Sequence, residues 1–366
     1  MKIVEFAIHT VPVNHRGDWV FVELTDDSGT CGLGEASGSA DDPRVVADME
    51  ARLRPLLDAE YEEAALLQKL WDSAPADFVP RVAASAIEQA AMDLIVRRSG
   101  KSVAEHLAAD PSAIRGDVPF YANLNRMCRD RSPETAAAAA RQAVAGGLRR
   151  VKFAPFDEVS PDKLARDGVD IAQPGAERLR ALRDAIGPDI ALMVDCHWRF
   201  TTETLPFLAD LARELSIGWI EDPMRVLDPA DMQDLRDRSG ARIAGGEALL
   251  MHQDFVDLAT SGAVDVLIAD VKFVGGIGPL DRICKMAAEN GVTFAPHNPT
   301  GPISTAASAH VVAANPNAEV LEFPFGEVPW RGDLAVGETI TGDRVSVRGP
   351  GLGVILDFAA AGEPAL

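Results

Sequence analysis

The sequence predicts an α/β protein with a barrel of the (β/α)₈ type and a separate α+β domain at the N-terminus. Two observations indicate this fold class. From about residue 119 onward, short apolar runs alternate with amphipathic helical stretches, which is typical of parallel strands joined by crossover helices. Before that point, residues 1–40 show strand patterns and residues 42–109 show helical ones, an order that favours an α+β unit. The length of 366 residues also exceeds what one core usually holds.

The N-terminal segment begins with strands. VFVELT (20–25) alternates apolar and polar side chains, and DDSG (26–29) provides a turn into the next strand. The stretch GTCGLG (29–34) superficially matches a dinucleotide-binding fingerprint, but the EASGSADD that follows it is typical of a loop and not of a helix. We therefore predict a hairpin at this position, followed by helices that stop at Gly100.

The barrel strands are expected where short apolar runs end in polar residues. Eight runs have this form: PFYANL, RRVKFA, IALMVD, IGWIED, RIAGGE, VLIAD, VTFAPH and VLEF. Helical stretches such as SPETAAAAARQAVAGG and PGAERLRALRDAIG separate them. After about Phe325, short strands and glycine turns return, and we expect this segment to pack back on the N-terminal domain. The predicted division is therefore 1–115, 116–325 for the barrel, and 326–366 for the C-terminal return.

Composition restricts the partners and the compartment. The formal net charge of −21 repels nucleic acid and anionic membranes, so we expect neither as a partner. The N-terminus lacks the pattern of a signal peptide, and no apolar run is long enough to span a bilayer. The cysteines are scattered without a C-x-x-C pair, which favours reduced thiols in a cytoplasmic protein. They are Cys31, Cys128, Cys196 and Cys284.

Three carboxylates end successive predicted strands at a constant spacing. Asp195, Glu221 and Glu247 are separated by 26 residues at each step, about one βα repeat. Because the C-terminal ends of neighbouring barrel strands lie side by side, these groups are expected to converge where barrel active sites lie. Converging carboxylates repel one another unless a cation neutralises them, and oxygen ligands suit Mg²⁺. A single acid is as easily a helix cap or a surface ion pair, but three in register favour a metal site.

Polar residues continue at the next strand ends. Asp270 follows the third carboxylate by 23 residues, His297 follows 27 residues later, and Glu322 lies in the last strand. A carboxylate beside an imidazole orients it and raises its basicity, so we interpret Asp270 and His297 as a catalytic pair. Lys152 ends the second strand, where it can face an anionic substrate. Lys272, two positions past Asp270, is interpreted as a salt-bridge residue.

In this order the motifs resemble the enolase superfamily, specifically the mandelate racemase subgroup and its acid-sugar dehydratases of the galactonate dehydratase type. The matching features are a strand-two Lys, an Asp-x-His, a Glu in WIEDP, a Glu in GGE, an Asp before a GGI turn, and a His in APHNPTGPIS. The resemblance covers nearly the whole chain. It implies a modified, (β/α)₇β-like TIM barrel, with an α+β capping domain formed by the N-terminal segment and the C-terminal return. It also implies Mg²⁺ held by Asp195, Glu221 and Glu247, and we expect a homo-oligomer.

Two departures from the racemase pattern favour elimination of water. Racemases of this subgroup carry Lys-x-Lys on strand two, whereas residues 152–154 read Lys-Phe-Ala, so the second base is missing. Racemases also have Asn where this chain has His197. A dehydratase needs a base on one face and an acid for the departing hydroxyl. His297 with Asp270 supplies the base, and His197 supplies the acid.

The expected reaction is removal of the proton α to the carboxylate of a sugar acid, with loss of the 3-hydroxyl to give a 2-keto-3-deoxy acid. Lys152 and the metal stabilise the enediolate in this interpretation, and Glu322 hydrogen-bonds the enediolate or a substrate hydroxyl. Substrate contacts are expected from the capping loop HRGDW and the strand ends, at Arg16, Trp19, Tyr121, Asn123 and Lys152.

Three alternatives stay open from the sequence. An epimerase or cycloisomerase would use the same metal site without eliminating water, and a 2-keto product would distinguish them. A barrel aldolase would form a Schiff base on Lys152 or Lys272, which borohydride would trap. A sugar-acid-binding protein is disfavoured, because binding alone does not require an Asp–His pair facing an acid.

Overall fold

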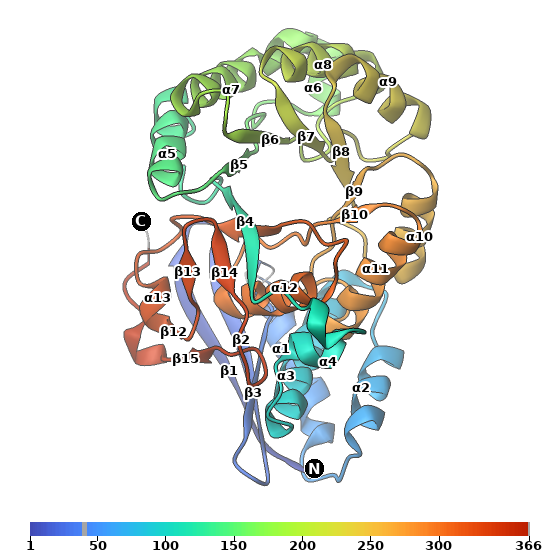
Figure 1. The fold of residues 1–366 in the computed structure, drawn as a ribbon, viewed down its shortest axis with the longest axis vertical. Helices are drawn as coiled ribbons and strands as arrows, with labels where there is room; N and C mark the ends of the chain where they lie inside the picture. The colour runs from blue at the N-terminus through green and yellow to red at the C-terminus, as the bar shows by residue number, and fades with distance from the viewer. Residues whose placement is uncertain (39–41, 365–366) are drawn as a thin grey trace.

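The N-terminal part is a three-stranded sheet covered by helices. The computed structural model describes residues 1–38 and 42–364 (Figure 1). An antiparallel meander joins β1 (Ile3–Asn14), β2 (Gly17–Asp26) and β3 (Cys31–Glu35). The helices that follow are α1 (Pro43–Leu53), α2 (Glu63–Asp72), α3 (Phe78–Arg98) and α4 (Val103–Leu107). The chain leaves α3 through Gly100 at φ 73°, as the sequence predicts.

The glycine-rich run at 29–34 serves the packing of this unit. It is a hairpin strand, as predicted, with Val22 opposite Gly34 and Leu24 opposite Gly32. A Cβ at either glycine would collide with the backbone of α3, at Ala90 and Leu94 for Gly32 and at Ala86 for Gly34. The glycines therefore let α3 lie directly on the sheet.

The central part is a ring of parallel strands. In chain order the strands are β4 (Asp117–Asn123), β5 (Arg150–Phe153), β6 (Ala191–Asp195), β7 (Ile217–Glu221), β8 (Arg242–Gly245), β9 (Val266–Leu267), β10 (Thr293–Phe294) and β11 (Leu321–Pro324). Each pairs with the next from β4 to β10, and β11 pairs with β4 to close the ring. Between β10 and β11 the contact is an isolated bridge, Phe294 with Ala318.

Helices form the outer layer of the ring, as the arch from α5 to α9 in Figure 1 shows. They are α5 (Pro133–Ala145), α6 (Pro161–Asp167), α7 (Gln173–Ile186), α8 (Leu205–Glu214), α9 (Pro229–Ser239), α10 (His252–Thr260), α11 (Ile277–Glu289) and α12 (Pro302–Ala314). Helices separate all successive ring strands, and β11 closes the ring without a following crossover helix. This confirms the predicted (β/α)₇β-like barrel.

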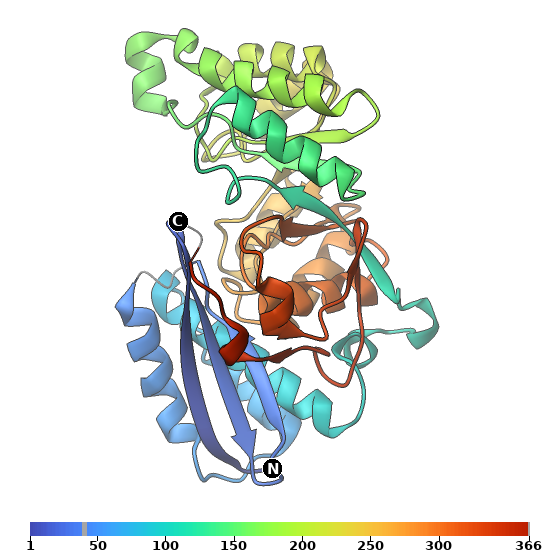
Figure 2. The same ribbon diagram turned by 90° about the vertical axis from the view of Figure 1, so that its left-hand side faces the viewer.

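The last segment returns across both parts. It contains α13 (Arg331–Leu334), β12 (Ala335–Val336), β13 (Ile340–Thr341), β14 (Arg344–Ser346) and β15 (Ile355–Leu356). In Figure 2 this red segment runs beside the blue N-terminal sheet, and Phe358 stacks on His9 with ring centroids 3.9 Å apart. β14 also pairs antiparallel with barrel strand β4, which the sequence did not predict. The division of the chain at residues 115 and 325 stays a prediction.

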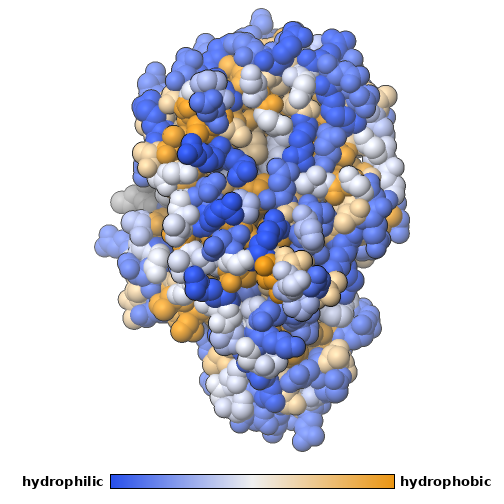
Figure 3. Space-filling view, viewed as in Figure 1, coloured by the Kyte–Doolittle hydropathy of each residue, from blue (hydrophilic) through white to orange (hydrophobic). Residues whose placement is uncertain are grey.

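The molecule has a largely hydrophilic surface. The face in Figure 3 is mostly covered by polar side chains, with apolar side chains in small separate areas. Within the described residues, no helix combines the length and apolar character needed to cross a bilayer.

Candidate active site

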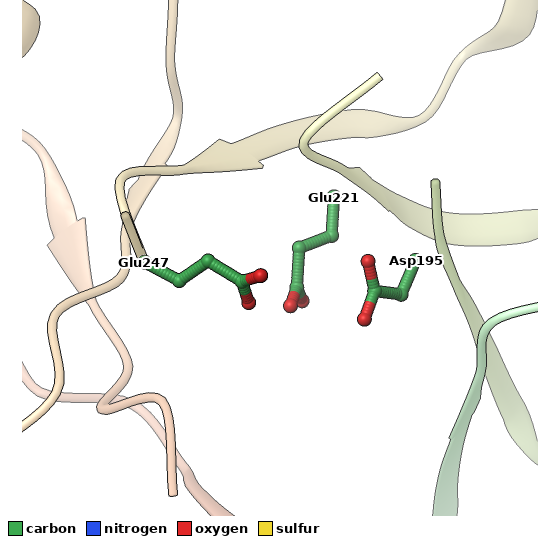
Figure 4. Close-up of side chains that lie close together, drawn as sticks. All are labelled: Asp195, Glu221 and Glu247. Atoms are coloured by element: carbon green, nitrogen blue, oxygen red, sulfur yellow. The ribbon is translucent and has the colours of Figure 1, made fainter. Parts of the chain in front are cut away.

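Three carboxylates meet at the C-terminal ends of neighbouring strands. Asp195 is the last residue of β6, Glu221 is the last of β7, and Glu247 lies two residues beyond β8. Figure 4 shows the three side chains pointing toward one another. One oxygen from each lies within 4.8 Å of the others, and all three residues are buried. The structure thus brings together the three acids that the spacing selected.

The electrostatics of this triad are unfavourable for carboxylates without a counter-ion. Burial raises the pKa of Glu221 well above its ordinary value, and the charge of Asp195 raises it further while Lys152 opposes the shift. Burial and the charges of Asp195, Asp222 and Glu221 likewise raise the pKa of Glu247. Asp195 differs. Burial alone would raise its pKa, but the charges of His197 and Lys152 lower it below its ordinary value.

These residues fit a divalent metal ion. The Oε2 atoms of Glu221 and Glu247 are buried without a hydrogen-bond partner among the described residues. Buried carboxylate oxygens that lack a donor are costly, and a cation bound by all three acids removes both that cost and their repulsion. A set of oxygen ligands alone suits a hard divalent ion.

An Asp–His pair lies at the Glu247 end of the triad. The Nδ1 atom of His297 lies 2.8 Å from Asp270 Oδ2, and its Nε2 atom lies 3.2 Å from Glu247 Oε2. Lys272 donates to the same oxygen of Asp270 at 2.8 Å, which is the salt bridge expected from the sequence. Although burial opposes it, the charges of Lys272 and His297 lower the pKa of Asp270. A carboxylate held ionised at Nδ1 leaves Nε2 free to accept a proton.

A second imidazole lies at the Asp195 end. The Nε2 atom of His197 lies 2.9 Å from Asp195 Oδ2, and the side chain is 31% exposed. The backbone turns sharply here, with positive φ at His197 (47°) and Trp198 (58°). Hydrogen bonds from Cys196 N to the carbonyl of Glu221 (2.9 Å) and from Trp198 N to that of Asp222 (2.7 Å) fix this turn across β7. The row of three carboxylates therefore has one imidazole at each end.

Lys152 contacts two acids of the triad. Its ammonium forms ion pairs with Glu221, with Glu322 at 3.0 Å and with Asp195 at 3.9 Å. Burial alone would lower the pKa of Lys152, but the charges of Glu221 and Glu322 raise it well above its ordinary value. Lys152 is therefore a fixed positive charge. Glu322 is held in turn by Asn123, whose Nδ2 donates to it at 2.6 Å.

Two expected substrate contacts have buried side chains. Trp19 is 1% exposed and packs edge-on against Trp330, with ring centroids 5.5 Å apart. Tyr121 is fully buried in the barrel interior, where Lys152 Nζ lies 5.3 Å from its ring centroid. Strand alternation turns both side chains into a core, and their contact with a substrate stays a prediction. Arg16 is exposed, in the turn between β1 and β2.

Sequence reasoning missed two residues that support the site. Asn298 donates its backbone N–H to Glu322 Oε2 at 2.8 Å, and its own Oδ1 is buried without a partner among the described residues. Asp222 is buried at φ 40° beside Glu221, with its Oδ2 similarly unpaired. In the sequence, their positions directly after His297 and Glu221 were what could have indicated a role in the site.

Fold and site together define a barrel enzyme with a carboxylate triad that fits a divalent metal ion and an adjacent Asp–His pair. The chain belongs to the enolase C-terminal domain-like family, whose model matches residues 134–360. This confirms the resemblance seen in the motifs.

Curated relatives extend the similarity over nearly the whole chain. D-gluconate dehydratase of Thermoproteus tenax is 27% identical over 351 residues, covering 92% of this chain and 68% of that protein. D-xylonate dehydratase of Haloferax volcanii is 29% identical over 367 residues, covering 96% and 87%. D-galactarolactone cycloisomerase of Agrobacterium fabrum is 28% identical over 364 residues, covering 94% and 90%.

Solved structures share the fold. A mandelate racemase/muconate lactonizing enzyme-like protein from Roseovarius sp. TM1035 has a TM-score of 0.84 at 24% identity, covering 100% of this chain and 96% of that one. A mandelate racemase/muconate lactonizing enzyme from Jannaschia sp. CCS1 has a TM-score of 0.83 at 24% identity, covering 99% and 97%.

Proposed function

We propose that this protein is a Mg²⁺-dependent sugar-acid dehydratase that converts its substrate to a 2-keto-3-deoxy acid. The observation that carries the proposal is the row of carboxylates with one imidazole at each end, His297 paired with Asp270 and His197 more exposed. The dehydratases among the curated relatives support the same reaction class.

The metal would be held by Asp195, Glu221 and Glu247, whose buried oxygens offer ligands to one ion. When bound, Mg²⁺ supplies positive charge next to the substrate carboxylate, which makes the α-proton more acidic. Lys152 adds a second, fixed positive charge at the same place, because Glu221 and Glu322 keep it protonated.

Proton abstraction falls to His297. Its Nδ1–H donates to Asp270, which fixes the tautomer and leaves the Nε2 lone pair to take the α-proton. The resulting imidazolium is stabilised by the ionised Asp270 carboxylate. Lys272 holds that carboxylate in place from its other side.

Departure of the hydroxyl falls to His197. Protonated, its ring donates a proton to the 3-hydroxyl, which leaves as water while the C2–C3 double bond forms. The enol product then becomes the 2-keto acid by proton transfer. In this proposal Glu322, which is held by Asn123 and the backbone of Asn298, accepts a hydrogen bond from a substrate hydroxyl.

The alternatives fit these contacts less well. A Schiff base needs a neutral amine, whereas both candidate lysines are buried in ion pairs, Lys152 with Glu221 and Glu322 and Lys272 with Asp270. A two-base epimerase needs a second base at the end of strand β5, and the residue just beyond this strand is Ala154, which is buried with its backbone N–H bonded to Asn125.

The test is a screen of sugar acids with Mg²⁺, read out by semicarbazide detection of 2-keto acids. We expect a 2-keto product that EDTA abolishes and added Mg²⁺ restores. Turnover of a sugar acid to its epimer, without a 2-keto product, would overturn the proposal. Trapping of a lysine adduct by borohydride would favour the aldolase.

A further inference from the structure

Basic side chains gather at the mouth of the barrel, although the chain carries a net charge of −21. His15 and Arg16 lie in the turn between β1 and β2, and Arg126 and Arg129 lie between β4 and α5. The three arginines act on the imidazole of His15. Burial and the charges of Arg16, Arg129 and Arg126 lower the pKa of His15. Segments from two separate parts of the fold therefore place positive charge in one region.

A hydrogen-bonded path connects this region to the reaction centre. Glu322, which pairs with Lys152, accepts from Asn123 Nδ2 at 2.6 Å. The Oδ1 of Asn123 accepts from the backbone of Asn125 at 2.8 Å, and Arg126 is the next residue. Asn125 Oδ1 also accepts from the backbone N–H of Ala154, just beyond β5, at 2.9 Å. The loop after β4 is therefore anchored to the barrel mouth.

The path continues from this loop to the capping turn. Arg126 forms an ion pair with the buried Glu327 at 3.0 Å, and Asn14 Nδ2 donates to the same Glu327 oxygen at 3.0 Å. The other side-chain atom of Asn14, Oδ1, accepts from the backbone N–H of Arg16 at 2.8 Å. Arg16 is thus held over the mouth by the same network that orders Glu322.

Ion pairs within the protein balance only part of the positive charge of this region. Arg126 is neutralised by Glu327, and Arg131 pairs with Asp157 at 2.7 Å. Among the residues that the structure describes, no acid forms an ion pair with Arg16 or Arg129. Two guanidinium groups are therefore available to an outside anion. Guanidinium groups suit carboxylate and phosphate groups, which they can bind through two parallel hydrogen bonds.

We propose that Arg16 and Arg129, together with His15, bind a second anionic group at the end of the substrate opposite the reacting carboxylate. This deepens the proposed function and rests on it, because it takes the first carboxylate to lie at the metal site. The substrate class is then a sugar acid charged at both ends, either a sugar diacid or a phosphorylated sugar acid. A local positive patch also offsets the repulsion that a dianion meets from an acidic protein.

The experiment compares matched ligands. A hexaric acid and the hexonic acid of the same configuration differ only at C6, a carboxylate against a hydroxymethyl group, and the 6-phosphorylated hexonic acid is the third arm. Binding to the Mg²⁺-loaded protein is measured by calorimetry over a panel of configurations, and kcat/KM is measured wherever a 2-keto product forms. We expect a ligand charged at both ends to bind roughly 10-fold or more tightly than its hexonic partner, since one charge-assisted hydrogen bond has that value. The third arm identifies carboxylate or phosphate as the distal group.

Arg-to-Gln variants test which residues cause the preference for doubly charged acids. Arg16→Gln and Arg129→Gln are each expected to remove most of this preference, because each weakens the binding of doubly charged acids more than the binding of hexonic acids. Arg141→Gln, the same change at an exposed position in the second half of α5, is the control and should leave the preference intact. The preference should also fall as NaCl is added, because exposed charges are screened.

The possible outcomes separate this inference from the dehydratase proposal. Equal binding of matched hexaric, hexonic and phosphorylated acids would overturn the anion subsite, and so would an unchanged preference in both Arg variants or the absence of binding by every doubly charged acid. A 2-keto product from hexonic acids alone would also overturn the subsite but leave the elimination standing. A clear calorimetric preference that depends on Arg16 and Arg129, without any 2-keto product, would support the subsite and refute the elimination.

Discussion

Replacing Glu35 tests how the N-terminal sheet (β1–β3) is bonded to the loop between His297 and α12. Glu35 ends β3, and its fully buried carboxylate accepts hydrogen bonds at the N-terminus of α12. The donors are the backbone N–H groups of Gly301 (2.8 Å), Ile303 (3.0 Å) and Ser304 (2.8 Å), with the Ser304 hydroxyl at 3.1 Å. This N-terminus begins only a few residues after His297, so the clamp also holds the loop that carries the proposed base.

The magnitude follows from these contacts. In Glu35→Ala the Ser304 hydroxyl keeps a partner, the carbonyl of Gly301 at 3.1 Å, but three buried N–H groups lose theirs. At about 1 kcal/mol for each unsatisfied group, the low end of the usual range, the local cost is about 3 kcal/mol. Glu35→Gln keeps one oxygen but turns an NH₂ group toward a donor, so a cost of about 1–2 kcal/mol is expected.

The assay is hydrogen exchange of the amides in residues 301–304, followed by mass spectrometry. A cost of about 3 kcal/mol predicts roughly 100-fold faster exchange in Glu35→Ala, because each 1.4 kcal/mol is a factor of ten. Glu35→Gln should give an intermediate rate. Glu177→Ala, at an exposed position of α7, is the matched control and should leave the rate unchanged. Equal exchange in Glu35→Ala and the control would refute the reasoning.

The remaining predictions concern the metal, the two proposed proton carriers and acid stability. Glu221→Gln or Glu247→Gln should lose Mg²⁺ binding, measured by calorimetry, together with activity while circular dichroism stays unchanged, because each removes one charge from a three-acid site. His297→Asn should stop incorporation of solvent deuterium at the substrate α-carbon. His197→Asn should retain that exchange while 2-keto formation falls by about 10²–10⁴-fold, the usual contribution of a general acid. Burial lowers the pKa of His310 from 6.5 to about 4, so its neutral form stabilises the fold above pH 6.5 and this stability is lost as the pH falls toward 4. Urea unfolding should show that moving from pH 7 to pH 5 costs the wild type about 2 kcal/mol more than His310→Asn.

Each of these has a result that would contradict it. Full activity of the EDTA-treated enzyme would remove the metal from the reaction. Persistent α-proton exchange in His297→Asn would make another group the base, and loss of both exchange and elimination in His197→Asn would make His197 the base or a structural anchor. An equal loss of stability between pH 7 and pH 5 in wild type and His310→Asn would show that His310 is not the group responsible.

The carboxylate triad shows what local sequence pattern is able to predict. Each acid follows an apolar run, and the 26-residue spacing matches one βα repeat, so the pattern itself places Asp195, Glu221 and Glu247 at adjacent strand ends. The same reasoning placed Asp270 next to His297, and the structure puts them 2.8 Å apart. Parallel strands joined by helices fix which ends are neighbours, whatever the details of side-chain packing.

The expected substrate contacts show what the pattern leaves open. Trp19 and Tyr121 lie on strands whose alternation is clear, but alternation does not say which face meets a core when both faces are covered. Trp19 turns inward because the C-terminal return brings Trp330 against it, 311 residues away in the sequence. Tyr121 fills the barrel interior against Trp219, with ring centroids 5.4 Å apart.

By itself the sequence determined the barrel, the order of its polar strand ends and the residues offered to a metal, because these depend on periodicities within one repeat. Only the tertiary structure decided the links between distant segments: Glu35 on the N-terminus of α12, and Asn14 and Arg126 on Glu327. Such contacts depend on how the capping sheet packs over the barrel mouth. No local periodicity encodes that arrangement, since it arises from the shapes and buried polar groups of two surfaces that meet only after each has folded.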